Sequence, residues 1–337
     1  MQGDLLHEGV NRASIWYPRQ FLADFESENR FAEETADMKT RAALSIVLSL
    51  LVLLSSSSAQ TERPVEVECG KYTKHDGKLI VNGVEVKPEV FPWHVLIYFK
   101  KKDMSYIDIC GGSLIRNSLV VSAAHCFYDE DSRNIKNASS FVVAAGKRYR
   151  AWDADEQYSQ KSLVESIEVD DLYLGLAGNF AMDIALLKLN TPFELNMLVY
   201  PICIDWAILY EKDLLQSEQL SKMVIWNKNI NDESNQTMYE IDMPYVMYNQ
   251  CVAESPINLR KFITLDKFCA GRLNDSSVCN QDGGSGLYVQ KEGVWYLRGI
   301  ASVKYGNIER CAYDKSYVGF TYVNYFRDWI REGYDSA

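Results

Sequence analysis

The chain has 337 residues, 47% of them hydrophobic, which is enough to bury the core of one large domain or two modest ones. Its formal net charge of −11 argues against a nucleic-acid partner, because binding phosphates requires a basic face. The acidic surface is otherwise that of an ordinary soluble protein.

The first element in chain order is a targeting segment. Residues 38–59 have the layout of a secretory signal peptide: two basic residues, an apolar run from Ala42 to Leu54, and small residues up to Ala59, where we expect cleavage. The run is shorter than the roughly 20 apolar residues of a spanning helix. Because such signals act at the amino terminus, residues 1–37 are expected to be a disordered upstream extension of the gene model. A membrane anchor with a short cytoplasmic tail is the alternative.

Secretion would place the eight cysteines in an oxidising compartment, where an even count favours disulfides over metal ligands. The sequence contains no paired C-x-x-C clusters, so we expect no metal site. Three Asn-x-Ser/Thr sequons agree with that compartment and predict glycosylation at Asn137, Asn235 and Asn274.

Beyond a polar lead segment that contains Cys69, short runs rich in β-branched and aromatic residues predict strands separated by turns, and therefore an all-β barrel or sandwich. The chain is expected to close with a helix whose apolar face holds Tyr322, Phe326, Trp329 and Ile330. The predicted strands lie in residues 93–99, 118–124, 140–146, 183–189, 222–226 and 293–303.

Six motifs occur in order along this region: FPWHVLIY (91–98), CGGSLI (110–115), SAAHC (122–126), DIALLKL (183–189), PICI (201–204) and FCAG (268–271). Over residues 78–332 the chain resembles the chymotrypsin-like serine proteases, and among them it looks most like the modular and clip-type proteases of arthropod immune cascades. The resemblance implies an all-β fold of two packed six-stranded antiparallel barrels, a cleft between them and a carboxy-terminal helix. It divides the mature chain into a lead segment, residues 60–79, and a protease domain, residues 80–337.

The chemistry of that family needs a hydroxyl nucleophile, an imidazole that takes its proton and a carboxylate that orients the imidazole. The resemblance makes His125 of SAAHC the base and Asp183 of DIALL the orienting acid. The family's Cys-x-x-Asp-Ser-Gly-Gly reads Cys279-Asn-Gln-Asp-Gly-Gly-Ser here, so the unchanged spacing puts Gly283 in the place of the serine. Ser285 becomes the nucleophile only if the loop shifts by two residues, which is the alternative.

Other family positions depart in the same region. Gln281 stands at the oxyanion-hole glycine, whose N–H is presented in a conformation that a side chain disfavours. In the specificity pocket, Ser277 takes the base, Lys304 and Val318 replace wall glycines, and Ser302 keeps the family residue. We expect these side chains to narrow or plug the pocket. The substitutions reflect either sequence drift after loss of catalysis or the conversion of the site into a binding pocket.

The activation switch is half retained. In the family, cleavage frees a hydrophobic terminus whose amine pairs with the aspartate beside the nucleophile; here the resemblance makes Ile80 the terminus and Asp282 its partner. Leu79 precedes the cut, where a trypsin-like activator needs Arg or Lys. Either a protease of chymotryptic preference cuts after Leu79, or the chain stays single.

The resemblance also pairs the cysteines and bears on calcium. Lys147 stands where some family members begin a calcium loop with Glu, so a cation site is not expected there. The implied disulfides are Cys110–Cys126, Cys251–Cys269, Cys279–Cys311 and Cys69–Cys203, the last of which tethers the lead segment.

The sequence thus predicts a secreted serine protease homologue that is catalytically inactive, has no cofactor, and acts as a binding cofactor or regulator in an extracellular, immune proteolytic cascade. The expected partners are other proteases, zymogens or inhibitors, with microbial ligands as a further option; no nucleic acid or membrane partner is expected. The alternatives are an active serine endopeptidase that uses Ser285, and a membrane-anchored receptor-like homologue.

Overall fold

The computed structural model describes residues 68–71, 79–80, 83–85, 91–207, 221–226, 237–273, 278, 282–304 and 317–337. The chain divides into two compact units, Met1–Glu66 and Val67–Ala337, and every described residue belongs to the second. Several predictions fall outside the described residues: the signal peptide, Ser277, Gln281, the sequons at Asn235 and Asn274, and the Cys279–Cys311 disulfide.

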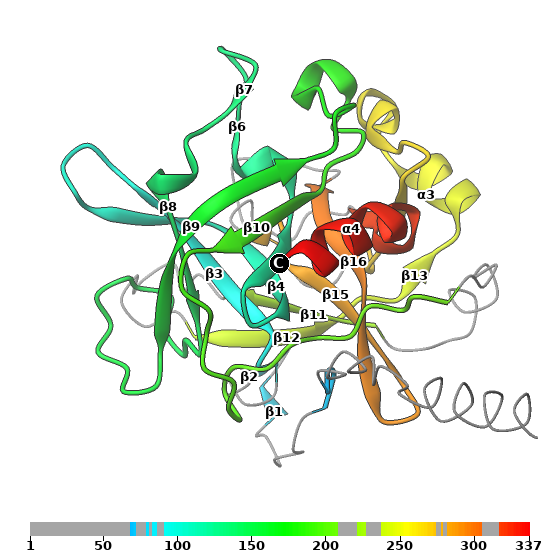
Figure 1. Cartoon of the computed structure of the whole chain (residues 1–337). Helices are drawn as coiled ribbons and strands as arrows, with labels where there is room; N and C mark the ends of the chain where they lie inside the picture. Colours follow the sequence, from blue (N-terminus) through cyan, green and yellow to red (C-terminus); the bar gives the residue numbers. More distant parts are fainter. Residues whose placement is uncertain are drawn as a thin grey trace, which may run out of the picture. The chain divides into compact units, whose positions relative to one another are not determined.

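Six antiparallel strands close into a first barrel in the order β10-β5-β4-β3-β8-β9 (Figure 1). Strands β5 and β8 are buried along their whole lengths, which is why each forms an unbroken apolar run in the sequence. The barrel strands are β3 (His94–Lys100), β4 (Tyr106–Arg116), β5 (Leu119–Ser122), β8 (Phe141–Ala145), β9 (Gln160–Val169) and β10 (Ala185–Leu189).

Nine strands form a second antiparallel sheet in the order β1-β2-β12-β11-β15-β16-β17-β14-β13. The all-β, chymotrypsin-like fold class is therefore confirmed, although the described part of the second sheet has no ladder that closes it. Its strands are β1 (Leu79–Ile80), β2 (Gly83–Glu85), β11 (Lys222–Trp226), β12 (Met238–Asp242), β13 (Tyr245–Val246), β14 (Lys267–Ala270), β15 (Gly286–Lys291), β16 (Val294–Lys304) and β17 (Val318–Tyr322).

Short helices and one small hairpin complete the described chain. The hairpin pairs β6 (Tyr128–Asp129) with β7 (Asn134–Ile135). None of the described helices has the length and apolar character needed to cross a membrane. The helices are η2 (Ala124–Cys126), η3 (Ala138–Ser140), η4 (Gly175–Gly178), α3 (Tyr248–Glu254), η6 (Ile257–Phe262), η8 (Val323–Phe326) and α4 (Arg327–Ser336).

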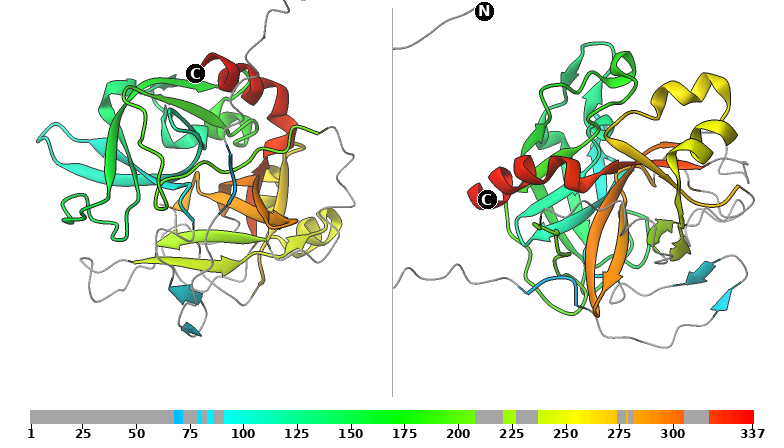
Figure 2. Two further views of the ribbon diagram at one scale, coloured as in Figure 1. Left: turned by 60° about the horizontal axis from the view of Figure 1, so that its bottom comes forward. Right: turned by 90° about the vertical axis from the view of Figure 1, so that its right-hand side faces the viewer.

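The carboxy-terminal helix α4 lies against the first barrel (Figure 2). Gly333 allows this approach, because a Cβ there would come within 2.5 Å of Leu186 Cδ1 in β10. Ile330 is fully buried, as the predicted apolar face requires. The assignment of Tyr322 to that face was wrong: Tyr322 ends strand β17, where its backbone pairs with Gly299.

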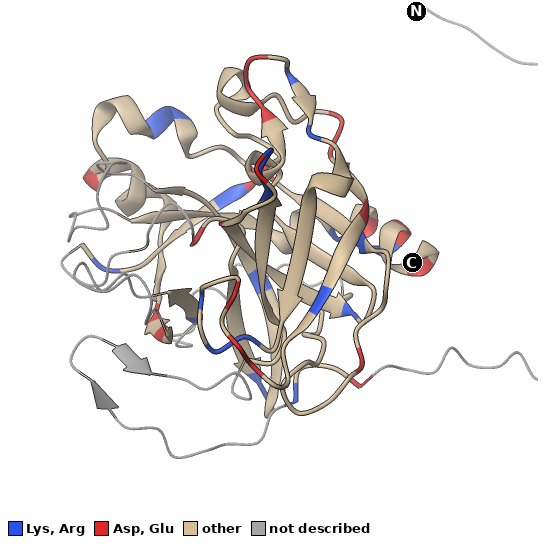
Figure 3. Ribbon diagram, turned by 90° about the vertical axis from the view of Figure 1, so that its left-hand side faces the viewer, with Lys and Arg blue, Asp and Glu red and all other residues tan. Residues whose placement is uncertain are grey.

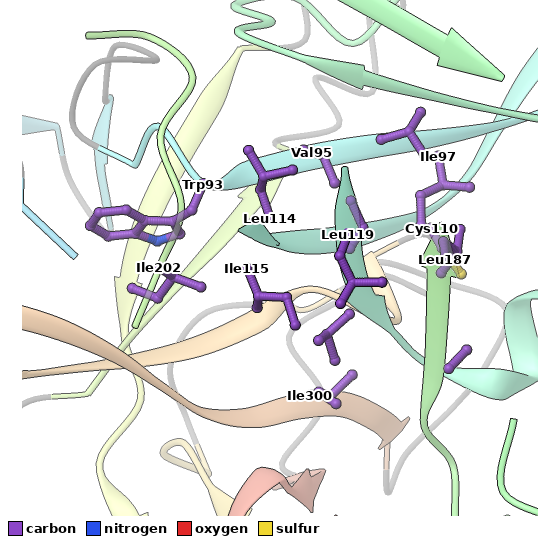
Figure 4. Close-up of a cluster of buried hydrophobic side chains, with 14 of the residues drawn as sticks. Trp93, Val95, Ile97, Cys110, Leu114, Ile115, Leu119, Leu187, Ile202 and Ile300 are labelled. Atoms are coloured by element: carbon purple, nitrogen blue, oxygen red, sulfur yellow. The ribbon is translucent and has the colours of Figure 1, made fainter. Parts of the chain in front are cut away.

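One hydrophobic core joins the barrel to the second sheet. Leu114, Leu119 and Leu187 of the barrel belong to the same buried cluster as Ile300 of β16 (Figure 4). Stacked and edge-on rings of Phe91, Trp93, Tyr288 and Trp295 extend it, with ring centroids 5.7–6.3 Å apart. Apolar burial on this scale holds the two halves in a fixed relation across the seam where the catalytic side chains of the family would lie.

Three of the implied disulfides are present: Cys69–Cys203, Cys110–Cys126 and Cys251–Cys269. The first joins the lead segment to the segment after the barrel, where Gly70 N also donates to Pro201 O at 2.8 Å. A cut between Leu79 and Ile80 would therefore leave the lead segment attached.

Candidate functional site

The base and the orienting acid meet at the seam between the barrel and the second sheet. His125 lies in η2, directly after β5, and Asp183 lies just before β10, the strand paired with β5. Asp183 Oδ1 accepts a 2.8 Å hydrogen bond from the backbone N–H of His125, and its Oδ2 lies 2.8 Å from His125 Nδ1. From the second sheet, Ser302 Oγ donates to the same carboxylate and Thr321 Oγ1 donates to Asp183 O.

This geometry fixes the tautomer of His125. Nδ1 carries the proton given to Asp183, so Nε2 is the free basic nitrogen, and it lies 4.0 Å from Cys110 Sγ. The imidazole is about one quarter exposed, whereas Asp183 is fully buried. Cys110 and Cys126 lie beside His125, but their sulfurs are joined in a disulfide and do not serve as thiolate metal ligands.

The electrostatics of the pair follow from burial and from mutual attraction. Burial opposes the charge on His125, but the carboxylate of Asp183 and its hydrogen bond outweigh it, so the pKa of His125 is raised. Burial likewise opposes the charge on Asp183, yet His125, Lys267 and Ser302 together lower the pKa of Asp183. Lys267, which sequence analysis missed, is a buried ammonium 2.8 Å from Asp266 Oδ2.

The loop from Asp282 to Gly286 lies against strand β4. Gly111 N donates to Gly283 O at 2.9 Å, which places Gly283 next to the residue that follows Cys110. Gly284 has φ +77°, and a Cβ there would lie 2.3 Å from Ser122 Oγ. Only glycine fits at 284, whereas Gly283 is not among the described glycines with positive φ, so a serine at 283 requires no backbone strain.

Ser285 points into the protein. It is fully buried, and its Oγ has no hydrogen-bond partner among the described residues. A Cβ built on Gly111 would lie 2.2 Å from Ser285 Oγ and 3.2 Å from His94 Cε1, so the hydroxyl faces strands β3 and β4. No hydrogen bond joins Ser285 to His125 within the described chain.

A second histidine, His94, is buried beside this loop, and sequence analysis did not identify it. His94 Nε2 accepts a 3.1 Å hydrogen bond from the indole N–H of Trp226, whose backbone N–H lies 3.2 Å from Asp282 Oδ1. Burial lowers the pKa of His94 to about 3, so it is neutral at physiological pH. His94 and Trp226 thus support the carboxylate that the family's activation switch uses.

Of the predicted specificity-pocket positions, the structure describes the side chains of Val318 and Ser302. Val318 is 6% exposed and packs in one cluster with Val278, Ala301 and Phe320. Sequence analysis did not single out Val278, one residue before Cys279, because no local sequence pattern reports its packing against Val318. Lys304 pairs with Val318 across β16 and β17, although its side chain lies outside the described atoms.

The structure also describes the predicted activation residues and Lys147. Leu79 and Ile80 form strand β1, paired with Val84 and Gly83 of β2. The buried Lys147 Nζ lies 2.8 Å from Glu156 Oε1 and donates to Ala151 O at 2.8 Å. The ammonium thus already occupies the space between Glu156 Oε1 and Ala151 O, which favours the expectation that this loop needs no calcium.

The fold and this constellation define the class of protein to which the chain belongs. The family model described as Trypsin matches residues 80–330, so the chain is a member of the trypsin family of chymotrypsin-like serine proteases.

Among its relatives, the modular serine protease of Drosophila melanogaster is 31% identical over 275 residues, which cover 79% of this chain and 42% of the relative. Limulus clotting factor C of Carcinoscorpius rotundicauda is 30% identical over 78% of this chain and 26% of its own length. Chymotrypsin-C of Rattus norvegicus is 31% identical, with 75% of this chain and 88% of the relative covered. The chain thus spans less than half the length of the first two of these relatives.

Proposed function

We propose that this chain is a pseudoprotease: a secreted, glycosylated, catalytically inactive member of the trypsin family that acts by binding. The observation that carries the proposal is the pair of positions 283 and 285. The residue in the nucleophile register is a glycine, and the nearby serine is fully buried without a hydrogen bond to His125. Loss of the nucleophile alone typically costs about 10⁶ in turnover.

The changes at the predicted specificity pocket support the same proposal. A substrate side chain needs an open slot, and Val318, which stands in the place of a wall glycine of the family, is buried in one apolar cluster with Val278. The intact His125–Asp183 pair does not restore function by itself, because an imidazole base needs a hydroxyl to deprotonate.

The names of the relatives support a role in an extracellular cascade. A modular serine protease and two clotting factors C are among them, together with mannan-binding lectin serine protease 1 of Homo sapiens. By analogy, we propose that this chain binds other proteases, zymogens or inhibitors as a regulator of an immune cascade. Residues 38–59 would serve as its signal peptide, and residues 60–79 would stay tethered through Cys69–Cys203.

The proposal is tested with protein secreted by cells that express the full chain. Its amino-terminal sequence is expected to begin at Gln60, and a start within residues 1–37 would favour a membrane-anchored form. Hydrolysis of a broad peptide-substrate panel is measured before and after a chymotryptic cut at Leu79, with a Ser285→Ala variant alongside. We expect no hydrolysis in any of these measurements. Activity of the parent protein that disappears in Ser285→Ala would establish Ser285 as the nucleophile.

A further inference from the structure

The loop that precedes Asp183 carries exposed leucines, and the carboxylates around them form no salt bridge with a Lys or Arg side chain in the described structure. Leu172, Leu174 and Leu176 are 66%, 56% and 52% exposed. They alternate with Tyr173 and Gly175, both buried, so every second residue of this loop turns outward. Tyr173 already supplies the loop's contact with the core, so the leucines are not needed for it. Contiguous exposed apolar side chains of this kind mark interaction sites.

The leucine loop is locked to the β6–β7 hairpin. Glu130 Oε1 accepts a 2.9 Å hydrogen bond from Leu176 N, and the rings of Tyr128 and Tyr173 meet edge-on with centroids 5.2 Å apart. Gly175 has φ +60°, and a Cβ there would lie 2.5 Å from Glu130 Oε1. The two segments therefore form one preorganised surface, which lowers the entropic cost of binding.

The same surface is acidic. None of its carboxylates forms a salt bridge with a Lys or Arg side chain in the described structure, and the hairpin and loop segments supply only Arg133 and Lys136 as basic residues. Acidic ribbon segments lie at the top of Figure 3, the end of the molecule where Figure 1 labels β6 and β7. The carboxylates belong to Asp129, Glu130, Asp131, Asp170 and Asp171.

We propose that this acidic leucine surface, residues 129–131 and 170–176, binds a basic, apolar peptide segment of a protein partner. Apolar side chains of the partner would cover Leu172, Leu174 and Leu176, and its Lys or Arg side chains would face the surrounding carboxylates. A second copy of this chain does not fit, because both copies carry a net charge of −11 and would present the same acidic groups. The inference rests on the proposed binding function and adds the chemistry of the partner.

The test uses the full chain as secreted and a labelled, end-blocked amphipathic peptide of Lys and Leu, with Glu–Leu and Lys–Ser peptides as controls. The variant Leu172→Ser/Leu174→Ser/Leu176→Ser is expected to lose about tenfold or more in affinity for the Lys–Leu peptide. Asp131→Asn/Asp171→Asn is expected to weaken binding and to flatten its dependence on salt. All titrations contain EDTA.

Matched controls distinguish binding at this surface from nonspecific hydrophobic binding and from binding at the cleft beside His125. Tyr158→Ser/Met197→Ser removes side chains of similar exposure elsewhere and is expected to leave affinity unchanged. His125→Ala is also expected to bind normally.

Equal binding of the Glu–Leu peptide, equal losses in the leucine and control variants, or loss of binding in His125→Ala would overturn the proposal. The intact mass of the peptide after each titration reports on catalysis separately, so a cleaved peptide contradicts the proposed inactivity and not the surface.

Discussion

Ser285→Ala is expected to leave the protein as stable as before or to stabilise it. Ser285 is fully buried, and its Oγ has no partner among the described residues, so the folded state bears the desolvation cost of a hydroxyl, about 1–3 kcal/mol. Removing one atom forfeits several dispersion contacts of about 0.1–0.2 kcal/mol each. The net expectation is a gain of about 1 kcal/mol in the free energy of unfolding, or about 2–4 °C in Tm for a domain of this size.

Ser122→Ala is the matched control. Ser122 is also fully buried, but its Oγ donates a 2.8 Å hydrogen bond to Gly111 O. Its removal leaves a buried carbonyl without that donor and should cost about 1–2 kcal/mol. Both variants are measured by urea unfolding with the disulfides intact. A loss in Ser285→Ala equal to that in Ser122→Ala would mean that the Ser285 hydroxyl has a partner and would refute the reasoning.

Three further predictions follow from the same contacts. Asp183→Asn should lower the pKa of His125, because burial then acts without the carboxylate that raises it; NMR titration of the His125 Cε1–H measures this, and an unchanged pKa would contradict the assigned pair. Gly284→Ala should destabilise the fold by at least about 2 kcal/mol through steric overlap. Gly293→Ala is the control: Gly293 has φ +82° and no atom within 4 Å of its Cβ, so the variant should cost only the left-handed backbone strain of about 1 kcal/mol. Equal losses of stability in thermal unfolding would refute the packing argument. Lys147→Met should lower the free energy of unfolding by about 3 kcal/mol, since it leaves the Glu156 carboxylate of a buried ion pair without its ammonium partner. EDTA should not change the Tm of the parent protein; a Tm that falls on adding EDTA would instead point to a bound cation.

The sign of the pH dependence follows from the raised pKa of His125. A group whose pKa is higher in the folded state contributes its full stability below the unfolded pKa, about 6.5, and loses that contribution as the pH rises through the folded value. Asp183 has a lowered pKa, so its contribution is present above the unfolded value and is lost as the pH falls through the folded one.

The strands that sequence analysis predicted best are those buried on both faces. Residues 222–226 became β11 with the same bounds, and residues 140–146 became β8. Strand β9 (Gln160–Val169) was missed, because the polar Ser162 is buried and the apolar Leu163 is exposed, which breaks the alternation that predicts a half-buried strand. Tyr322 was misplaced because an aromatic residue serves equally well at the end of a strand and on the face of the helix that follows.

The site was predictable as far as local motifs reached. SAAHC and DIALL carry His125 and Asp183 in short contiguous segments, so their meeting was expected. The approach of His94 to the loop of Ser285 depends on Gly111 lying between them, and no local pattern reports such packing between distant segments. The same is true of Val278 against Val318, since Val278 lies outside the strands and only the folded chain brings the two side chains together.

The central claim is tested most directly by intact-mass measurement of the secreted protein after reaction with a serine-directed phosphonate, before and after a chymotryptic cut at Leu79. The account predicts no adduct on the parent chain, because Gly283 supplies no hydroxyl and Ser285 Oγ is buried. In the Gly283→Ser variant, an adduct would further mean that His125 and Asp183 still activate a serine at that position. An adduct on the parent that maps to Ser285 would contradict the account and identify an active serine protease.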